Sequence, residues 1–497
     1  MSGLLVAGTT SDAGKSVLTT GLCRAAVRRG IRVAPYKAQN MSNNSMVCAD
    51  GAGGWAEIGR AQWVQARAAR AVPEAAMNPV LLKPGGDTRS HVVVMGQPGG
   101  TVSSKNWESG RAHLATAAHA AYDDLAGRYD LVIAEGAGSP TEINLRAGDY
   151  VNMGLARHAG LPVVVVGDID RGGLFAALHG TVALLEAADQ ALVAGFVANK
   201  FRGDLGLLRP GIDELTRLTG RPTYGVLPWH PDLWLDSEDA LDLDGRRGRG
   251  TDALRVAVVR LPRISNFTDV DALGVEPDVD VAFAASPRDL DDADLVVLPG
   301  TRATLDDLAW LRSRGLDDAV RAHAAAGRAV LGICGGAQML GARIEDPDGI
   351  EDAASRSEDG LGLVDARTTF GGDKVLRLPT GTGLGQPVSG YEIHHGRFRP
   401  GTGDAFPGGV RAGAVFATMW HGSLECDGFR QAFLGEVSAA LGRDRTPTDV
   451  GFGARREARL DLLGDLVEEH LDVDALLGLA RDGVPAGLPL LPPGCDR

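Results

Sequence analysis

The sequence predicts an α/β protein made of two successive domains, each built on a largely parallel sheet. Near-continuous runs of Val, Ile and Leu alternate with helical patterns in both halves of the chain, as in parallel sheets that helices cover on both faces. At 497 residues the chain is also too long for a single ordinary core. We expect a first domain at 1–235, a linker at 236–252, a second domain at 253–445, and a C-terminal helix with a tail at 446–497.

The composition excludes several classes of protein. Hydrophobic residues make up 44% of the chain and charged residues 23%, as in ordinary globular proteins. The net charge of −14 argues against nucleic acid as the main partner. No apolar run reaches the roughly 18 residues of a membrane span, so we expect no membrane partner. Five scattered cysteines without metal-ligand spacing, and an N-terminus without a signal sequence, indicate the reducing cytoplasm.

The first domain begins with an apolar run at 4–7, a glycine-rich turn and a helical pattern at 17–29. Ligands of parallel sheets bind at the carboxyl ends of the strands, so the residues that follow each strand are the candidates for function. Further strands are predicted at 31–36, 130–134, 162–167, 194–199 and 223–227.

The turn after the first strand carries a phosphate-binding motif, GTTSDAGKS. Its strand–loop–helix context lets backbone N–H groups and the helix N-terminus face phosphate oxygens, with Lys15 on the outer phosphates and the Ser16 hydroxyl on Mg²⁺. Five residues separate Gly8 from Gly14, one more than the strict pattern has. We predict nucleotide binding rather than a turn without nucleotide. The predicted loop residues are Gly8, Thr9, Asp12, Gly14, Lys15 and Ser16.

Polar residues follow the predicted strands on the same side as the phosphate loop. Lys37 ends the second strand, where it could contact a phosphate or an acyl phosphate. Glu135 follows the third strand, and with Asp50 it is a candidate ligand of Mg²⁺. A single carboxylate of this kind is more often a cap or a surface ion pair, but several beside a phosphate loop favour a magnesium nucleotide. Candidate substrate contacts are Gln39, Asn40 and Arg60.

The second domain repeats the alternating pattern, with strands predicted at 254–259, 279–284, 294–298 and 329–333. The last of these strands ends in Gly-Ile-Cys-Gly-Gly, a nucleophile elbow centred on Cys334. The following helix N-terminus favours the thiolate, so we favour a catalytic cysteine over a small buried hydrophobe. Backbone N–H groups of Gly300 and Gly335 are the candidate oxyanion hole.

A cysteine nucleophile needs a base, and three downstream histidines are candidates. They are His394 and His395 in YEIHHG, and His421, which follows an apolar run. Position in the sequence does not decide among them. The segment 346–385, between the elbow and these histidines, is rich in Gly and Asp and predicts a surface loop. Apolar residues three or four apart at 454–480 predict a packing helix.

Motifs along nearly the whole chain resemble those of the cobyric acid synthase family, the glutamine-dependent amidotransferases of cobalamin biosynthesis. The motifs are GTTSDAGKS, PYKAQNMSNNS, EIGRAQ, MNPVLLKP, EGAGSP, NKFRGD, LPGT, GICGGAQMLG, YEIHHG and WHG. The resemblance implies a P-loop amidoligase domain of the dethiobiotin synthetase type, followed by a class I glutamine amidotransferase domain. It also implies amidation of the b, d, e and g carboxylates of adenosylcobyrinic acid a,c-diamide to cobyric acid, with ATP, Mg²⁺ and glutamine as the ammonia donor.

The resemblance assigns roles to particular residues. Cys334 would be the glutaminase nucleophile and His421 its general base, and Asn199 of NKFRGD would join the ATP site. His394 of YEIHHG remains a runner-up with a role in substrate binding or structure. Class I domains usually have His-Pro-Glu, but here Gly-Ser follows His421, so no glutamate stands at that offset. Glu425 is near, but the pattern does not assign it as the orienting group. The third member of the glutaminase site stays open.

Three other functions compete with this interpretation. One is cobyrinic acid a,c-diamide synthase, which performs the same chemistry on two different carboxylates. Another is a P-loop ATPase with a non-catalytic glutaminase-like domain, and the third is a glutaminase with a regulatory nucleotide domain. The intact Cys334 and His421 argue against the ATPase. Because water would protonate free ammonia, the favoured function also predicts a covered path between the two domains.

Overall fold

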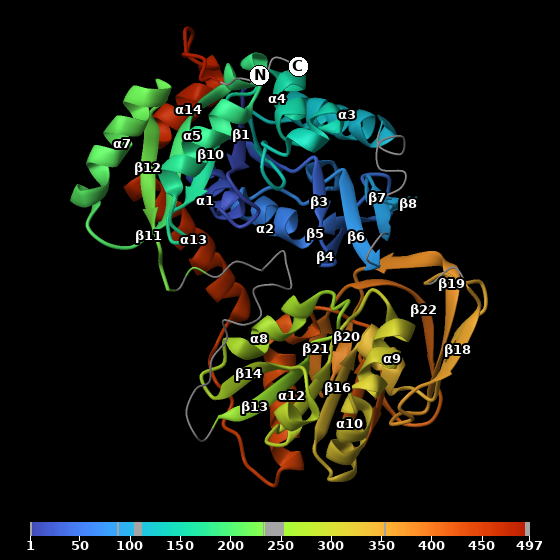
Figure 1. Ribbon diagram of the computed structural model, residues 1–497. Helices are drawn as coiled ribbons and strands as arrows, with labels where there is room; N and C mark the ends of the chain where they lie inside the picture. The colour runs from blue at the N-terminus through green and yellow to red at the C-terminus, as the bar shows by residue number, and fades with distance from the viewer. Residues whose placement is uncertain are drawn as a thin grey trace.

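The computed structural model describes residues 2–86, 89–103, 112–231, 233, 253–351 and 354–492. It shows two bodies, one holding the N-terminal half of the chain and the other most of the C-terminal half (Figure 1). The predicted linker at 236–252 lies outside the described residues.

A six-stranded sheet in the order β12-β11-β10-β1-β9-β2, parallel throughout, forms the centre of the first body. Its central strand β1 is apolar and buried on both faces, as expected of a sheet between two layers of helices. The strands follow the Val, Ile and Leu runs of the sequence. They are β1 (Ser2–Gly8), β2 (Val33–Tyr36), β9 (Leu131–Glu135), β10 (Val163–Asp168), β11 (Val193–Phe201) and β12 (Thr223–Pro228).

Helices cover this sheet on both sides and connect its parallel strands (Figure 1). The phosphate-loop helix α1 starts directly after the loop, at Lys15. The helices of this layer are α1 (Lys15–Arg28), α2 (Arg60–Ala68), α3 (Ala112–Arg128), α4 (Met153–Ala159), α5 (Leu174–Leu184), α6 (Ala187–Gln190) and α7 (Leu205–Thr219).

A small, mostly antiparallel region is inserted between β2 and β9, on the side of the first body that faces the second (Figure 1). It contains a four-stranded sheet in the order β3-β6-β7-β8 and the hairpin β4-β5. Its strands are β3 (Gln39–Met41), β4 (Ser45–Ala49), β5 (Trp55–Gly59), β6 (Val80–Gly86), β7 (Arg89–Val94) and β8 (Gln97–Ser103).

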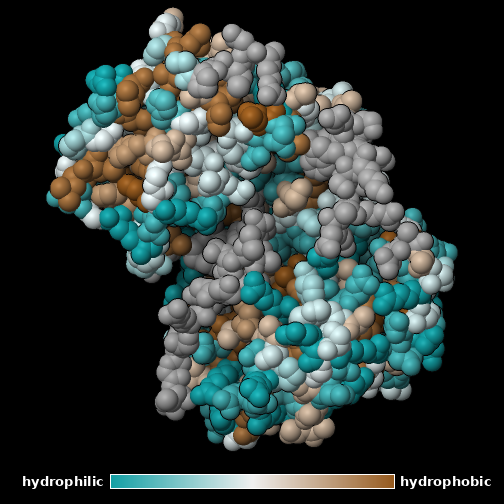
Figure 2. Space-filling view, in the orientation of Figure 1, coloured by the Kyte–Doolittle hydropathy of each residue, from teal (hydrophilic) through white to brown (hydrophobic). Residues whose placement is uncertain are grey.

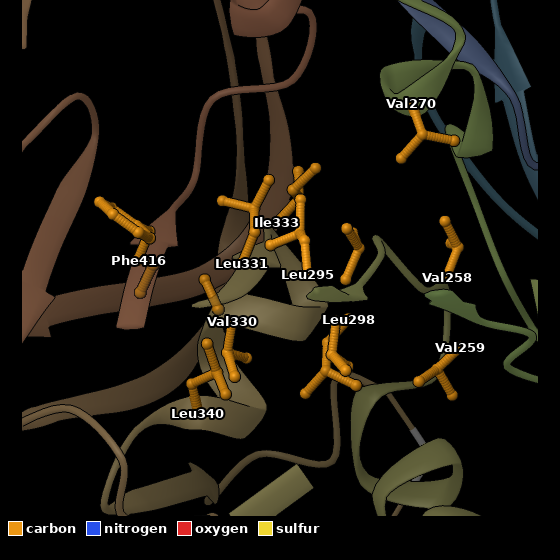
Figure 3. Close-up of a cluster of buried hydrophobic side chains, with 14 of the residues drawn as sticks. Val258, Val259, Val270, Leu295, Leu298, Val330, Leu331, Ile333, Leu340 and Phe416 are labelled. Carbon is orange, nitrogen blue, oxygen red and sulfur yellow. The ribbon is translucent and has the colours of Figure 1, made fainter. Parts of the chain in front are cut away.

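The second body contains a seven-stranded sheet in the order β14-β13-β15-β16-β25-β24-β23. Pairing is parallel from β14 to β25 and antiparallel at β24 and β23. Figure 3 shows part of the core on both faces of this sheet: Val258 and Ile333 lie on the same face as Val270, and Leu298 lies with Val330 and Leu340 on the other. The strands are β13 (Leu254–Val259), β14 (Val279–Ala284), β15 (Leu295–Leu298), β16 (Ala329–Ile333), β23 (Asp404–Phe406), β24 (Gly409–Ala412) and β25 (Val415–Thr418).

The helices of the second body are short and follow its strands closely. The helix α11 begins directly after the predicted elbow cysteine. They are α8 (Asp271–Gly274), α9 (Thr304–Ser313), α10 (Leu316–Ala325), α11 (Gly335–Leu340) and α12 (Asp427–Ala440).

The predicted surface loop at 346–385 is wrong, because strands occupy much of this segment. A second sheet in the order β18-β17-β19-β22 and the hairpin β20-β21 lie here. Glycine and aspartate obscured the strand pattern, since both are depleted in strands. The strands are β17 (Arg343–Asp346), β18 (Arg356–Asp359), β19 (Ala366–Arg377), β20 (Thr380–Gly383), β21 (Gln386–Ser389) and β22 (Glu392–Pro400).

The C-terminal segment returns to the first body, where helices α13 (Phe452–His470) and α14 (Val473–Asp482) pack (Figure 1). Leu463 and Val467 of α13 are buried in one cluster with residues of α1. Helices α1 and α13 lie in close contact at Gly21 of α1, where an added Cβ would lie only 2.4 Å from Val467 Cγ2. The packing helix predicted from the spacing is therefore present, and it completes the first body.

The surface of the first body carries an apolar region around α7, whereas the visible face of the second body is mostly hydrophilic (Figure 2). Leu207 of α7 is 83% exposed. Within the described ranges, no helix combines the length and the hydropathy needed to cross a membrane.

Candidate functional site

The phosphate loop closes with Gly14 in the left-handed conformation, at φ 101°. A Cβ at this position would lie 1.9 Å from Asn199 Nδ2, so no other residue fits without rearrangement. The Asn199 amide donates to the Ala13 carbonyl at 2.9 Å. The structure therefore brings Asn199, from the end of β11, against the loop.

Lys15 lies over the loop that precedes it. Its ammonium donates to the carbonyls of Thr10 at 2.9 Å, Ser11 at 3.1 Å and Gly138 at 3.0 Å. Each of the three ammonium N–H groups therefore has a carbonyl acceptor, and these hydrogen bonds hold the positive charge at the centre of the loop. This is where a phosphate oxygen would be bound.

Three side chains donate hydrogen bonds to Glu135 at the end of β9. Its buried carboxylate accepts from Ser16 Oγ at 3.0 Å, Lys37 Nζ at 2.8 Å and Gln65 Nε2 at 2.6 Å. Burial alone would raise the pKa of Glu135, but the charges of Lys37 and Lys15 and the hydrogen bonds lower it below the usual range. The carboxylate is therefore ionised at neutral pH. Gln65 was not predicted, because it lies in the middle of helix α2, far from any strand end.

The pair Ser16 and Glu135 suits Mg²⁺, which prefers hard oxygen ligands and keeps water and phosphate in its remaining positions. The structure does not bring the third predicted ligand, Asp50, to this pair. The Asp50 carboxylate accepts the N–H groups of Ala52 at 2.8 Å and Gly54 at 2.7 Å, within the β4–β5 turn. Among the described residues, no group of three or more His, Cys, Asp or Glu side chains could hold a metal.

The remaining residues of the loop have structural partners. The Thr9 N–H donates to Val166 of β10 at 2.9 Å, which extends the sheet beyond Gly8. The Asp12 carboxylate pairs with Arg171, and the Asp12 carbonyl accepts from Lys200 Nζ at 2.9 Å. These contacts fix the outer rim of the loop against the loops that follow β10 and β11.

The structure places the predicted substrate residues in two different locations. Gln39 accepts from Tyr150 at 2.5 Å and lines a cavity of about 120 Å³ at the strand ends, and Asn40 donates to Gln62 at 3.0 Å. Arg60 is buried, and its guanidinium donates to Glu425 of the second body at 2.8 Å. The charge of Arg60 is therefore used within the interface between the bodies, and its contact with substrate stays a prediction.

Cys334 stands at a strained turn between β16 and α11, with φ 52° and ψ −108°. Such strain in a residue other than glycine is a feature of nucleophile elbows. The flanking glycines are required by space: a Cβ on Gly336 would lie 1.9 Å from the Leu298 carbonyl oxygen, and one on Gly335 would lie 2.6 Å from Thr301 Cγ2.

His421 is the histidine that reaches Cys334, and it is held by an aspartate. His421 Nδ1 bonds Asp269 Oδ2 at 2.7 Å, while Asp269 Oδ1 accepts the Gly422 N–H at 2.7 Å. Burial alone would lower the pKa of His421, whereas the negative charges of Asp269 and Cys334, with their hydrogen bonds, raise it to about 10. The geometry therefore places an imidazolium beside the Cys334 sulfur, as an activated cysteine nucleophile requires.

Asp269 is the functional residue that sequence reasoning missed. It lies 152 residues before His421, on the short 3-10 helix Phe267–Val270, where no motif or periodicity marks it. Glu425 pairs instead with Arg60 and Arg456. His394 lines the cavity that begins at Cys334, with its Nε2 3.5 Å from Glu392.

Both predicted oxyanion residues lie at the elbow. Gly335 directly follows Cys334 and is the first residue of α11, so its N–H points out of the helix N-terminus. Gly300 lies in the turn after β15, where a Cβ would lie 2.9 Å from His421 Cε1. The two glycines therefore flank the reacting side chains.

A cavity of about 370 Å³ begins at Cys334 and is lined by both bodies. From the first body it includes Lys83 and His91, and from the second it includes Arg302 and Lys374. Burial, together with nearby positive charges that act in the same direction, lowers the pKa of His91 to about 3. His91 is therefore a neutral imidazole at physiological pH.

The fold and the two sites define a two-domain glutamine amidotransferase with a nucleotide-binding domain. Residues 4–242 match the family described as "CobQ/CobB/MinD/ParA nucleotide binding domain". Residues 255–429 match the "CobB/CobQ-like glutamine amidotransferase domain". One solved structure described as "Crystal structure of glutamine amidotransferase" is 22% identical, with a TM-score of 0.29, and the match covers 37% of this chain and 98% of that one.

Relatives similar over the full length identify the family. The cobyric acid synthase of Mycolicibacterium gilvum is 71% identical over 495 residues, 99% of this chain and 100% of that protein. The cobyric acid synthase of Mycobacterium ulcerans is 70% identical over the same shares of the two chains. The chain belongs to the cobyric acid synthase family, and it is a glutamine-hydrolysing amidoligase.

Proposed function

We propose that this protein amidates the b, d, e and g carboxylates of adenosylcobyrinic acid a,c-diamide to give cobyric acid. The observation that carries the proposal is the combination of two sites in one chain: a Cys–His–Asp group at an elbow and a lysine–glutamate cluster at a phosphate loop. The first suits the release of ammonia from glutamine, and the second suits the activation of a carboxylate by ATP. The full-length similarity to cobyric acid synthases supports the corrinoid as the substrate.

The first body activates the carboxylate, which is a poor electrophile because its leaving group would be oxide. Attack of the carboxylate oxygen on the γ-phosphorus of ATP forms an acyl phosphate and releases ADP. Lys15 and Lys37 stabilise the charge on the transferred phosphoryl group. Ser16 and Glu135 would hold Mg²⁺, which neutralises charge on the phosphates when it is bound. Attack of ammonia on the acyl carbon then expels phosphate and forms the amide.

The second body supplies the ammonia. The Cys334 thiolate attacks the side-chain amide of glutamine, and backbone N–H groups of Gly300 and Gly335 would stabilise the oxyanion. The His421 imidazolium donates its proton to the leaving nitrogen, which departs as ammonia and leaves a thioester. His421, now neutral, activates the water that hydrolyses the thioester to glutamate and frees Cys334. Asp269 keeps the ring oriented through both steps.

The cavity between the two bodies suits the passage of the ammonia. It starts at Cys334 and includes residues of β6, β7 and β8 from the first body. Positive side chains along it disfavour the entry of ammonium, while the neutral His91 can exchange hydrogen bonds with ammonia. The lining therefore supports transfer of ammonia in its neutral form.

The test is mass spectrometry of adenosylcobyrinic acid a,c-diamide incubated with the protein, MgATP and glutamine. We expect four successive replacements of OH by NH₂ with the unsubstituted protein. Cys334→Ala should lose more than about 99% of the glutamine-dependent amidation, because no other nucleophile is available, yet still form the product with ammonium. Amidation of cobyrinic acid itself at two positions would favour a cobyrinic acid a,c-diamide synthase instead. ATP hydrolysis with no amidated product would refute the amidoligase.

A further inference from the structure

The cavity at Cys334 contains a cation whose charge no neighbouring group neutralises by contact. Arg302 stands two residues after Gly300, and its backbone N–H is fixed by the Arg263 carbonyl at 3.0 Å. Its side chain lines the same cavity as Cys334. Within the described ranges, the Arg302 guanidinium makes no hydrogen bond and no ion pair. Its five N–H donors are therefore available to a bound molecule.

The other two cations of the cavity already have a carboxylate partner, which they share. Lys83 and Lys374 both pair with the carboxylate of Glu57, which lies on β5. An anionic group that enters from the Cys334 side would therefore find Arg302 as its partner. The negative charge of Asp269, which pairs with His421, would repel it.

A carboxylate lines the cavity near Arg302. Glu351 accepts the N–H groups of Thr304 at 2.8 Å and Leu305 at 3.0 Å, at the start of α9. Asp346 holds this segment in place by accepting the Glu351 N–H at 2.9 Å. Because each Glu351 oxygen has accepted one N–H, lone pairs remain for a ligand.

Arg302 and Glu351 act on each other electrostatically without forming an ion pair. The charge of Arg302 lowers the pKa of Glu351, although burial has the larger effect and raises it to about 6. The carboxylate is therefore mostly ionised at neutral pH. Two opposite charges that face one cavity and stay apart match the head of an α-amino acid, which carries a carboxylate and an ammonium group on one carbon.

We propose that Arg302 binds the α-carboxylate of glutamine, with Glu351 facing its α-ammonium group, so that the side-chain amide reaches Cys334. The assignment rests on the proposed glutaminase function and names the residues that select its substrate. A guanidinium binds a carboxylate through two parallel hydrogen bonds, which gives orientation as well as affinity. Because the loop 300–302 carries both Gly300 and Arg302, it would bind the oxyanion and the head group of one molecule.

The test compares glutamine with 4-aminobutanamide, which is glutamine without its α-carboxylate. Ammonia release is measured for the unsubstituted protein, Arg302→Ala and Arg302→Lys, with Arg314→Ala as a matched control on the exposed end of α9. We expect Arg302→Ala to raise the KM for glutamine about 100-fold with a much smaller change in kcat, since the lost contact binds the ground state and the transition state alike. Arg302→Lys should recover part of the affinity, and Arg314→Ala should behave as the unsubstituted protein does.

The analogue separates substrate recognition from a structural role. The unsubstituted protein should prefer glutamine over 4-aminobutanamide by about 100-fold, and Arg302→Ala should lose most of this preference. Ammonium-dependent amidation by Arg302→Ala should persist, which shows that the chain is folded. An unchanged KM, or an equal loss of activity toward both amides, would overturn the assignment. If the unsubstituted protein released no ammonia from glutamine, the proposed function would itself be overturned.

Discussion

At the scale of single residues, Asp269 decides the charge state of the glutaminase site. It bonds His421 at 2.7 Å and also accepts the Gly422 N–H, so the ring and the backbone beside it are fixed together. With this carboxylate in place, the pKa of His421 is raised to about 10, so an imidazolium lies beside Cys334 at neutral pH. The aspartate thus replaces the glutamate that class I domains usually carry after the histidine.

Asp269→Asn should therefore move the alkaline limit of glutaminase activity. Removing a negative neighbour lowers the pKa of His421, so the imidazolium and the activity should be lost at a lower pH than in the unsubstituted protein. The change is measured as the pH profile of kcat/KM for glutamine. We expect the alkaline limb to shift down by more than one pH unit, with kcat at pH 7 reduced about 10²–10⁴-fold. An unshifted alkaline limb would contradict the orienting role of Asp269.

Cys334 and Asp269 show what the sequence reveals at this scale. A cysteine between glycines at the end of an apolar run is a local signal, because the turn itself demands the glycines. Asp269 acts only through distant residues that the fold brings to it, and it lies on a short turn without periodicity. Arg60 was predicted as a substrate contact because the sequence alone does not reveal its partner: Glu425 lies 365 residues away.

At the scale of elements, Glu57 joins three strands from two bodies. Its buried carboxylate on β5 pairs with Lys83 on β6 and Lys374 on β19, and it accepts from Ser45 Oγ at 2.6 Å. Burial alone would raise the pKa of Glu57, but the two lysines lower it below the usual range. For Lys83 burial has the larger effect and lowers the pKa to about 8, although Glu57 opposes it. One carboxylate therefore holds two buried cations in the interface.

Glu57→Gln should destabilise the protein more than the loss of a surface charge does. It leaves two buried ammonium groups without a counter-charge, which costs about 3–5 kcal/mol. The free energy of unfolding is measured by urea titration of the full chain. Glu345→Gln is the control, because Glu345 is 43% exposed and pairs with Arg343 at the surface, so its loss should cost less than about 1 kcal/mol. Equal losses in the two variants would show that the Glu57 group contributes little.

The elements of the two large sheets could be predicted, and those of the interface could not. Apolar runs at 130–134 and 162–167 correspond to β9 and β10, because strands buried on both faces need continuous apolar sequence. The run at 223–227 corresponds to the edge strand β12. The strands β8 and β19 are polar and rich in glycine, so they lack this signal.

At the scale of the whole molecule, the chain starts and ends in the same body. Helix α13 packs on α1, the helix of the phosphate loop, and Arg28 of α1 pairs with Asp461 and Asp465 of α13. The spacing of apolar residues predicted an amphipathic helix, but it could not indicate which surface would cover it. The return of the chain ties the second body to the first at both ends.

The central claim is that the two sites exchange ammonia inside the protein, and isotope labelling tests it directly. Glutamine labelled with ¹⁵N in its side-chain amide is supplied with the corrinoid and MgATP in a large excess of unlabelled ammonium, at neutral pH. Because the cavity joins Cys334 to the first body, we expect nearly every new amide to carry ¹⁵N in the first turnovers. Amides that contain mainly the unlabelled nitrogen would contradict the claim, since the ammonia would then have mixed with the solvent before it reacted.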